Sequence, residues 1–294
     1  MRRLIEKTLT IFAWASSMLV VIAIALIVIF LLKHGLEALN LELFFGDVSL
    51  WDALTGAEVV WDGIWPACVG TVYLVFLSSV IAIPMGIASG IFLAQYSQGV
   101  MKSMISFAID VLAGIPSIVM GLFGFAMVLF LKRVMGVHAT TCLLLSAVCI
   151  AMLILPYVIR TTQVSLEGVP ESLKLEGQAL GLTMWQTVVH ILLPHAAVGI
   201  MSGMFLAVGR AAEDTAVIML TGVVANAGIP YSLAGKFEAL PFVIYYQAAE
   251  YRTPEDLQKG FGAALVLLML TTTIFIGARM LQKIMEKRWK CSRI

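Results

Sequence analysis

The chain alternates between long apolar segments and shorter polar connections. Six segments have the length and apolar content to cross a bilayer as a helix, which takes roughly 20 residues. They are residues 11–32, 67–96, 107–131, 139–158, 196–224 and 261–277. The second is over-long and contains Pro84 and Gly86, so we expect it to tilt, kink or continue beyond the bilayer. The pattern predicts an all-α polytopic membrane protein with six transmembrane helices.

The first apolar segment follows a short basic N-terminus, an arrangement that signal peptides also show. It runs over residues 11–32 without a charge, which is too long for a signal peptide, and no small-residue cleavage site follows it. We therefore expect a retained first span, so that residues 1–65 form an anchor helix with an acidic external loop, and residues 66–294 form the main core.

Charged residues are distributed unevenly along the chain. Six acidic residues lie after the first span: Glu37, Glu42, Asp47, Asp52, Glu58 and Asp62. Basic residues accumulate at the C-terminus: Arg279, Lys283, Lys287, Arg288, Lys290 and Arg293. Because Lys and Arg favour cytoplasmic loops, both termini are expected in the cytoplasm.

Composition excludes several classes of protein. The 294 residues are 61% hydrophobic and 13% charged, which is typical of an integral membrane protein. A formal net charge of +1 gives no basis for a nucleic-acid partner. The four cysteines have no metal-ligand spacing, so neither a metal site nor a catalytic cysteine is expected.

The connection between the fourth and fifth spans, residues 160–195, is too long to be a simple linker. Pro170 followed by Glu171 is typical of a helix start, Gly181 of a break, and residues 184–193 resume an apolar helical pattern. The pattern predicts helix, turn and helix at the cytoplasmic surface. Spacing alone also allows an amphipathic segment that rests on lipid headgroups.

This loop resembles the coupling motif of ABC transporter permeases: Glu-Ala-Ala, three residues, Gly, nine residues, then Ile-x-Leu-Pro. After Gly181, nine residues precede the matching tetrapeptide, which is Ile191, Leu192, Leu193 and Pro194. The first half departs, because Leu175 takes the glutamate position and Glu176 and Gly177 take the two alanine positions. The resemblance implies that an ATPase docks on residues that include Glu176, Ala179, Leu180, Gly181 and Pro194.

Three further stretches are similar to the permeases of the bacterial high-affinity phosphate importer. They are VLAGIPSIVMGLFG (111–124), VPESLKLEGQALGLTMWQT (169–187) and GRAAEDTAVIMLTG (209–222). The usual Arg-Ala-x-Gly-Glu-Thr of that family is matched at Arg210, Ala211 and Thr215. Asp214 replaces the family glutamate and Glu213 its glycine. The segment 240–248 and the chain length look more like the A-type subunit than the C-type.

Arg210 interrupts the fifth apolar segment. A charge at membrane depth is costly unless it faces protein, water or an opposite charge. On a continuous helix, Asp214 would share the face of Arg210 one turn along, and Glu213 would lie nearby. One reading is a structural ion cluster. The resemblance favours the other, an anion pathway formed by Arg210, Glu213, Asp214 and Thr215, since a guanidinium matches phosphate oxygens.

Two other features of the sequence have a local interpretation. Asp110 is expected to cap the N-terminus of the third span, and the sequence GIPS (114–117) to break or bend it, since proline removes a backbone bond. A Walker A motif is absent: residues 232–237, SLAGKF, lack its first glycine and its Ser or Thr. Any ATP would therefore bind to partner subunits, and the chain itself needs no cofactor.

These observations predict a type I ABC importer permease fold, in a bacterial or archaeal cytoplasmic membrane. The resemblance implies transport of inorganic phosphate with three kinds of partner: a second homologous permease, two copies of an ATPase and an external phosphate-binding protein. Three alternatives stay open. They are another oxyanion such as sulfate, molybdate or phosphonate, an intramembrane enzyme that uses Glu213 or Asp214, and a scaffold without transport activity.

Overall fold

The computed structural model describes residues 2–55, 58, 60–135 and 140–291. Within that part of the chain, six helices are long and apolar enough to cross a membrane, which confirms the predicted number. They cover Glu6–Ala38, Trp65–Tyr96, Ser117–Val134, Leu143–Glu167, Met184–Glu213 and Pro254–Met280. The regular structure of the described residues is all-helical, as expected, apart from an isolated bridge between Val223 and Phe237.

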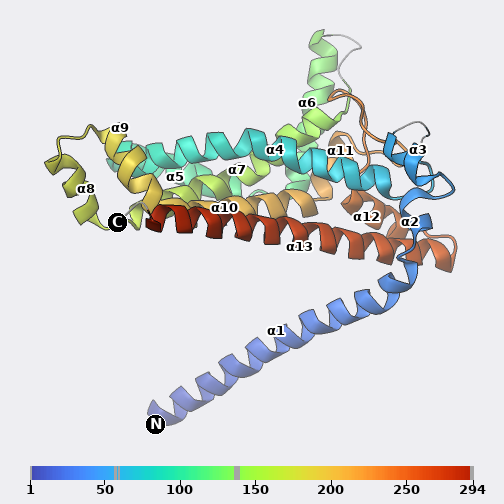
Figure 1. Ribbon diagram of the computed structural model, residues 1–294, viewed down its shortest axis with the longest axis horizontal. Coiled ribbons are helices and arrows are strands. Elements are labelled where there is room, and N and C mark those ends of the chain that lie inside the picture. The colour runs from blue at the N-terminus through green and yellow to red at the C-terminus, as the bar shows by residue number, and fades with distance from the viewer. Residues whose placement is uncertain (1, 56–57, 59, 136–139, 292–294) are drawn as a thin grey trace.

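The helices follow one another in a simple order. Their bounds are α1 (Arg2–Ala38), α2 (Leu41–Phe45), α3 (Leu50–Thr55), α4 (Trp65–Ile91), α5 (Gly99–Ala113), α6 (Ser117–Met135), α7 (Leu143–Glu167), α8 (Glu171–Ala179), α9 (Met184–Thr187), α10 (Leu193–Glu213), α11 (Ala216–Thr221), α12 (Leu240–Glu250) and α13 (Pro254–Cys291). Two π-helical turns, Phe92–Tyr96 and Val188–Leu192, extend α4 and join α9 to α10. We call the end of the bundle with α8 the α8 end, and the opposite end, with α12, the α12 end (Figure 1).

The core lies where α4 and α10 pack against α7. Glycines permit the close approach: a Cβ on Gly86 of α4 would lie 2.6 Å from Cγ1 of Val158, and one on Gly90 would lie 2.8 Å from the Ile159 carbonyl. On α10, a Cβ on Gly203 would collide with Thr161. Small residues at four-residue spacing therefore serve contacts within this chain.

Helix α1 diverges from the bundle (Figure 1). None of its most apolar 18-residue window is buried. It touches α13 near its C-terminal end, where the rings of Phe30 and Phe261 meet edge to face at 5.5 Å. In this chain alone, α1 thus presents apolar side chains around most of its circumference.

The third apolar segment is two helices and not one. Helix α5 ends at Ala113 and α6 begins at Ser117, and we call residues 114–116 the elbow. Pro116 lacks an N–H and disfavours helical geometry at the residue before it, so the predicted break is confirmed. The interpretation of Asp110 as an N-terminal cap was wrong: it lies in the last turn of α5 and pairs with Arg160.

The loop predicted at 160–195 is shorter than expected. Helix α7 continues to Glu167, so Arg160 is helical, and we call the connection at residues 168–192 the α8–α9 segment. Pro170 precedes the first helical residue, Glu171, as predicted. Gly181 has φ +72°, a left-handed conformation that favours glycine, which confirms the predicted break.

Gly86→Ala is expected to destabilise the protein by about 1–3 kcal/mol, because its Cβ would overlap Val158 in a packed contact. Thermal melting of the purified protein in detergent measures this. The matched control is Gly277→Ala in α13, where nothing lies within 4 Å of the added Cβ. An equal melting temperature for the two variants would contradict the packing argument.

Candidate membrane pathway site

The site begins where α10 stops. Asp214 is extended (φ −74°, ψ 119°), and α11 starts at Ala216. The Asp214 side chain is 8% exposed, and its Oδ1 accepts a hydrogen bond of 2.9 Å from the Val217 N–H. Asp214 therefore satisfies a backbone donor that the new helix leaves free. The prediction that Asp214 shares a helical face with Arg210 was wrong, because the helix ends between them.

Arg210 and Glu213 point away from the bundle. Both are exposed on this chain, whereas Ala211 and Ala212 between them are buried. Among the described residues, the salt bridges join Lys102 to Glu167 and Arg160 to Asp110, and none involves Arg210. The structural ion cluster considered from the sequence does not form within the described chain. Thr215 is half-buried at the start of α11.

Helix α7 gives the depth of Arg210. Gly199 of α10 faces Ser165 and Gly203 faces Thr161, so the two helices run antiparallel in a fixed register. With the same rise per residue, Arg210 lies level with about residue 154, near the middle of α7. A guanidinium at that depth is costly in lipid. The exposed face of α10 must therefore meet protein or water.

Local packing holds the break in place. Beyond it, α11 packs on α6, where a Cβ on Gly121 would lie 2.9 Å from the Ala216 carbonyl. Thr221 at the end of α11 forms a buried hydrogen bond of 2.8 Å with Ser146 of α7. Arg210 lies in the last turn of α10, where the helix dipole favours a cation. The position of the arginine is thus defined from both sides of the break.

The α8–α9 segment presents most of the residues expected to couple to an ATPase. Glu176, Ala179, Leu180 and Gly181 are exposed, and Pro194 is half-buried in the first turn of α10. Leu180 is 75% exposed, a large value for an apolar side chain at a turn. A capping box between Thr183 and Gln186 starts α9. The departure at Gly177 has a packing reason: a Cβ there would lie 2.8 Å from the Thr187 side chain.

The buried side chains of the α8–α9 segment pack on the C-terminal end of α7. Leu166 and Val169 form a buried cluster with Val188 and Leu192. His190 and His195 bond to backbone carbonyls one turn back, at 3.0 and 2.6 Å. Groups of three or more potential metal ligands are absent from the described residues. The segment is therefore a firmly seated surface feature.

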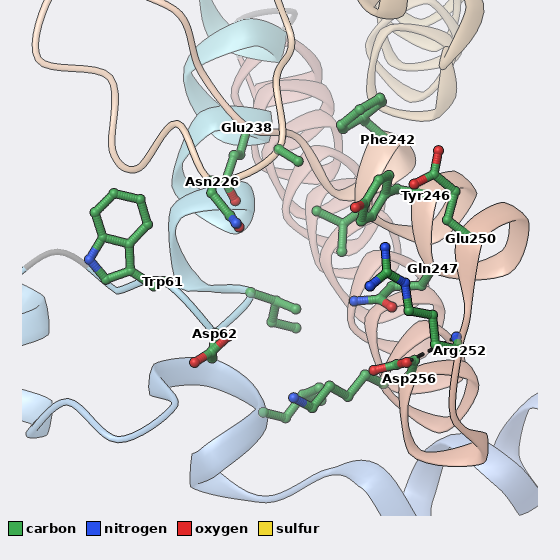
Figure 2. A pocket seen from close by; sticks show the side chains of 16 residues that line it. Trp61, Asp62, Asn226, Glu238, Phe242, Tyr246, Gln247, Glu250, Arg252 and Asp256 are labelled. Carbon is green, nitrogen blue, oxygen red and sulfur yellow. Dashed lines mark hydrogen bonds between the residues drawn. The ribbon is translucent and has the colours of Figure 1, made fainter.

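A pocket of about 260 Å³ opens at the α12 end. Figure 2 shows Trp61 and Asp62 on one side of it and Tyr246, Glu250 and Arg252 on the other. Sequence reasoning did not identify this pocket, because its walls come from four separate parts of the chain.

One wall of the pocket contains a buried carboxylate. Glu238 is 5% exposed, and its Oε1 accepts a hydrogen bond of 3.0 Å from the Gly228 N–H. Burial raises the pKa of Glu238 above its ordinary value, against the opposing effect of its backbone hydrogen bonds. Glu238 thus ties two parts of the irregular chain between α11 and α12 to each other.

Known proteins share this architecture. A bacterial ABC transporter involved in the import of the acidic polysaccharide alginate aligns with a TM-score of 0.60 and 14% identity, over 90% of this chain and 95% of that one. The fold is that of the membrane-spanning subunit of ABC importers, as predicted.

The family follows from the sequence comparisons. The model of the binding-protein-dependent transport system inner membrane component matches residues 82–290, and the chain belongs to this family. It is 32% identical to the phosphate transport system permease protein PstA 1 of Mycobacterium tuberculosis, over 77% of this chain and 72% of the relative. It is 31% identical to the PstA protein of Haemophilus influenzae, over 83% of each.

Family membership decides between the classes that the sequence left open. The chain is a multi-pass inner-membrane permease component and not the ATPase, and systems of this kind include an ATPase and a binding protein. This assignment excludes two alternatives, an intramembrane enzyme and a scaffold without transport activity.

Asp214→Ala is expected to lower stability by about 1 kcal/mol or more, because the Val217 N–H loses its acceptor. Asp214→Asn keeps an oxygen at that position and should stay near the wild type. Thermal melting of both variants measures the difference. If alanine and asparagine behave alike, the hydrogen bond does not hold the break.

Proposed function

We propose that this chain is one of two homologous permease subunits through which an ATP-driven importer moves inorganic phosphate into the cytoplasm. The observation that carries the proposal is the exposed Arg210 guanidinium, which lies level with the middle of α7 and has no salt bridge among the described residues. The phosphate transport relatives favour phosphate as the solute.

The exposed faces of α10 and α1 support a second permease as partner. Apolar side chains surround α1, and the charged edge of α10 needs cover from lipid. Between two such subunits, the facing α10 helices would enclose a passage. Arg210 would be a transient contact for the anion, since a site that binds tightly does not release.

The charges near Arg210 need a further partner. Asp214 is turned into the protein, but Glu213 is exposed beside the proposed route. An unpaired carboxylate there would repel phosphate. We expect the partner permease to supply a cation that faces Glu213, which restores a favourable balance for an anion.

The remaining partners fit the two ends of the bundle. The basic C-terminal segment supports a cytoplasmic α8 end, with both termini in the cytoplasm. Two copies of an ATPase would then dock on the exposed α8–α9 segments of the two permeases. An external phosphate-binding protein would dock at the α12 end, where the pocket beside Trp61 and Tyr246 offers a recessed polar surface.

Arg210→Gln is expected to reduce phosphate uptake to background, a loss of at least about tenfold, because a bidentate charged contact is removed. The assay is ATP-dependent uptake of labelled phosphate into vesicles that contain the purified complex. Arg133→Gln, at an exposed arginine near the end of α6, is the matched control. Normal uptake by Arg210→Gln in an assembled complex would eliminate the pathway role.

The same vesicles distinguish phosphate from other oxyanions. Excess unlabelled phosphate should compete with the labelled solute, and sulfate, molybdate or phosphonate should not. Competition by sulfate at equal concentration would favour the alternative of a different oxyanion.

Leu180→Asp is expected to lower ATP-driven uptake by at least about tenfold, because a charge replaces an apolar side chain that is 75% exposed at the proposed ATPase contact. Gly181→Asp should act likewise, with added strain at φ +72°. Co-purification of the ATPase and uptake are measured together. Leu233→Asp, at an exposed leucine of the opposite end of the bundle, is the control for ATPase association. Unchanged ATPase association and uptake in both coupling variants would remove this assignment.

A further inference from the structure

Side chains of α5 and α7 form one connected polar network toward the α8 end. Arg160 Nε donates to Asp110 Oδ1 at 2.8 Å, and Nη2 donates to the other carboxylate oxygen. Lys102 Nζ lies 2.7 Å from Glu167 Oε1. We call these four residues, with Gln163, the clasp. Lys102 and Asp110 belong to α5, and the other three belong to α7.

Gln163 joins the two ion pairs. It is 4% exposed, accepts from Arg160 Nη1 at 3.0 Å, and donates to Glu167 Oε1 at 2.9 Å. Arg160 also donates to the Ser106 carbonyl at 3.2 Å. The contacts on α5 fall four residues apart, on one face. The clasp therefore fastens about two turns of α5 to about two turns of α7.

Few side chains of α5 are buried. Of its 15 residues, Ile109 is the one that is buried. An exposed single ion pair stabilises weakly, but a bidentate arginine pair within a network also specifies geometry. The clasp therefore defines the position of α5 against α7 together with one small apolar contact, in which Ile109 packs on Ile159.

The clasp reaches from the α8–α9 segment to the elbow. Glu167 is the last residue of α7, and α8 begins at Glu171. Asp110 lies one turn before Gly114, the first residue of the elbow. A Cβ on Gly114 would meet nothing closer than 3.5 Å, whereas Ile115 packs on the main apolar core, so the elbow is in contact with the bundle through Ile115.

Beyond the elbow, contacts continue to the proposed pathway. Helix α6 leaves the direction of the bundle (Figure 1) and packs on α11 through Gly121 and Ala216. Helix α11 starts at the break next to Arg210. A contiguous set of packed elements thus connects the proposed ATPase contact with the arginine, which is the physical basis that long-range coupling requires.

From these contacts we infer that the clasp makes α5, α7 and the α8–α9 segment one lever, which transmits motion of that segment through the elbow to α6 and the break at Arg210. Asp110 and Arg160 are positioning residues for transport and touch no solute. This inference rests on the proposed function, because motion that starts at the α8–α9 segment requires an ATPase docked there.

The first experiment measures phosphate imported per ATP hydrolysed by the complete complex in vesicles. Asp110→Asn and Arg160→Gln each break the bidentate pair, and the ratio should fall roughly 2- to 30-fold, the range of measured coupling changes. ATP hydrolysis and the amount of assembled complex should stay near the wild type. The charge exchange Asp110→Arg with Arg160→Asp should restore most of the ratio. Arg133→Gln is the control for loss of an exposed arginine.

Two results would overturn the inference: an unchanged ratio in the single variants, or a lowered ratio that the charge exchange does not restore. If a single variant fails to assemble, Lys102→Gln decides, because that side chain is one-third exposed and its removal leaves the core intact. Its ratio should also fall, and a wild-type ratio in Lys102→Gln would count against the lever.

The second experiment does not depend on the solute. Spin labels are placed at Lys132→Cys on α6 and Val164→Cys on α7, both exposed, after the native cysteines are replaced. Addition of ATP should change the distance between the labels, and Asp110→Asn should abolish that change. An ATP response that Asp110→Asn leaves intact would reject the lever even if phosphate transport holds. A wild-type complex that responds to ATP but imports no phosphate would reject the proposed solute and not the lever.

Discussion

A guanidinium at mid-bilayer must be kept from hydrocarbon, and the arrangement around α10 follows from that constraint. Buried small residues of α10 pack against α7, and Arg210 lies at the edge of the opposite, exposed face. No salt bridge among the described residues neutralises it. The chain is thus incomplete as an isolated unit, because its charged edge needs an interface or a water-filled passage.

Two interruptions of the helices are connected through the contact of α6 with α11. The elbow at 114–116 separates α5 from α6, and Asp214 separates α10 from α11. Irregular backbone at membrane depth is tolerated where other groups satisfy it. Asp214 bonds to the Val217 N–H, and α6 covers α11 closely through Gly121. Broken helices of this kind are permitted because the break is lined by protein.

The α8 end and the α12 end of the bundle are held together by different kinds of contact. At the α8 end, ion pairs and a buried glutamine link α5 to α7, and an apolar cluster links α7 to the α8–α9 segment. At the α12 end, Glu238 holds an irregular segment through backbone N–H groups beside an open pocket. One end is built as a connected body, and the other is built as a recessed surface.

The sequence by itself determined the number of spans, because only an apolar segment long enough to cross the hydrocarbon layer can form one. It also determined the breaks at Gly181 and Pro116, where local backbone chemistry leaves few conformations. It identified Arg210 as a residue that lipid cannot surround.

Only the tertiary structure decided where α10 ends, since Asp214 fits equally well within a helix or at a cap until the packing of α11 is known. The same holds for Asp110, which was expected to cap a helix and instead binds Arg160, 50 residues away. Glu238 had no local signal at all. A polar side chain carries its need for a partner in the sequence, but the partner lies on another segment, and only packing brings the two together.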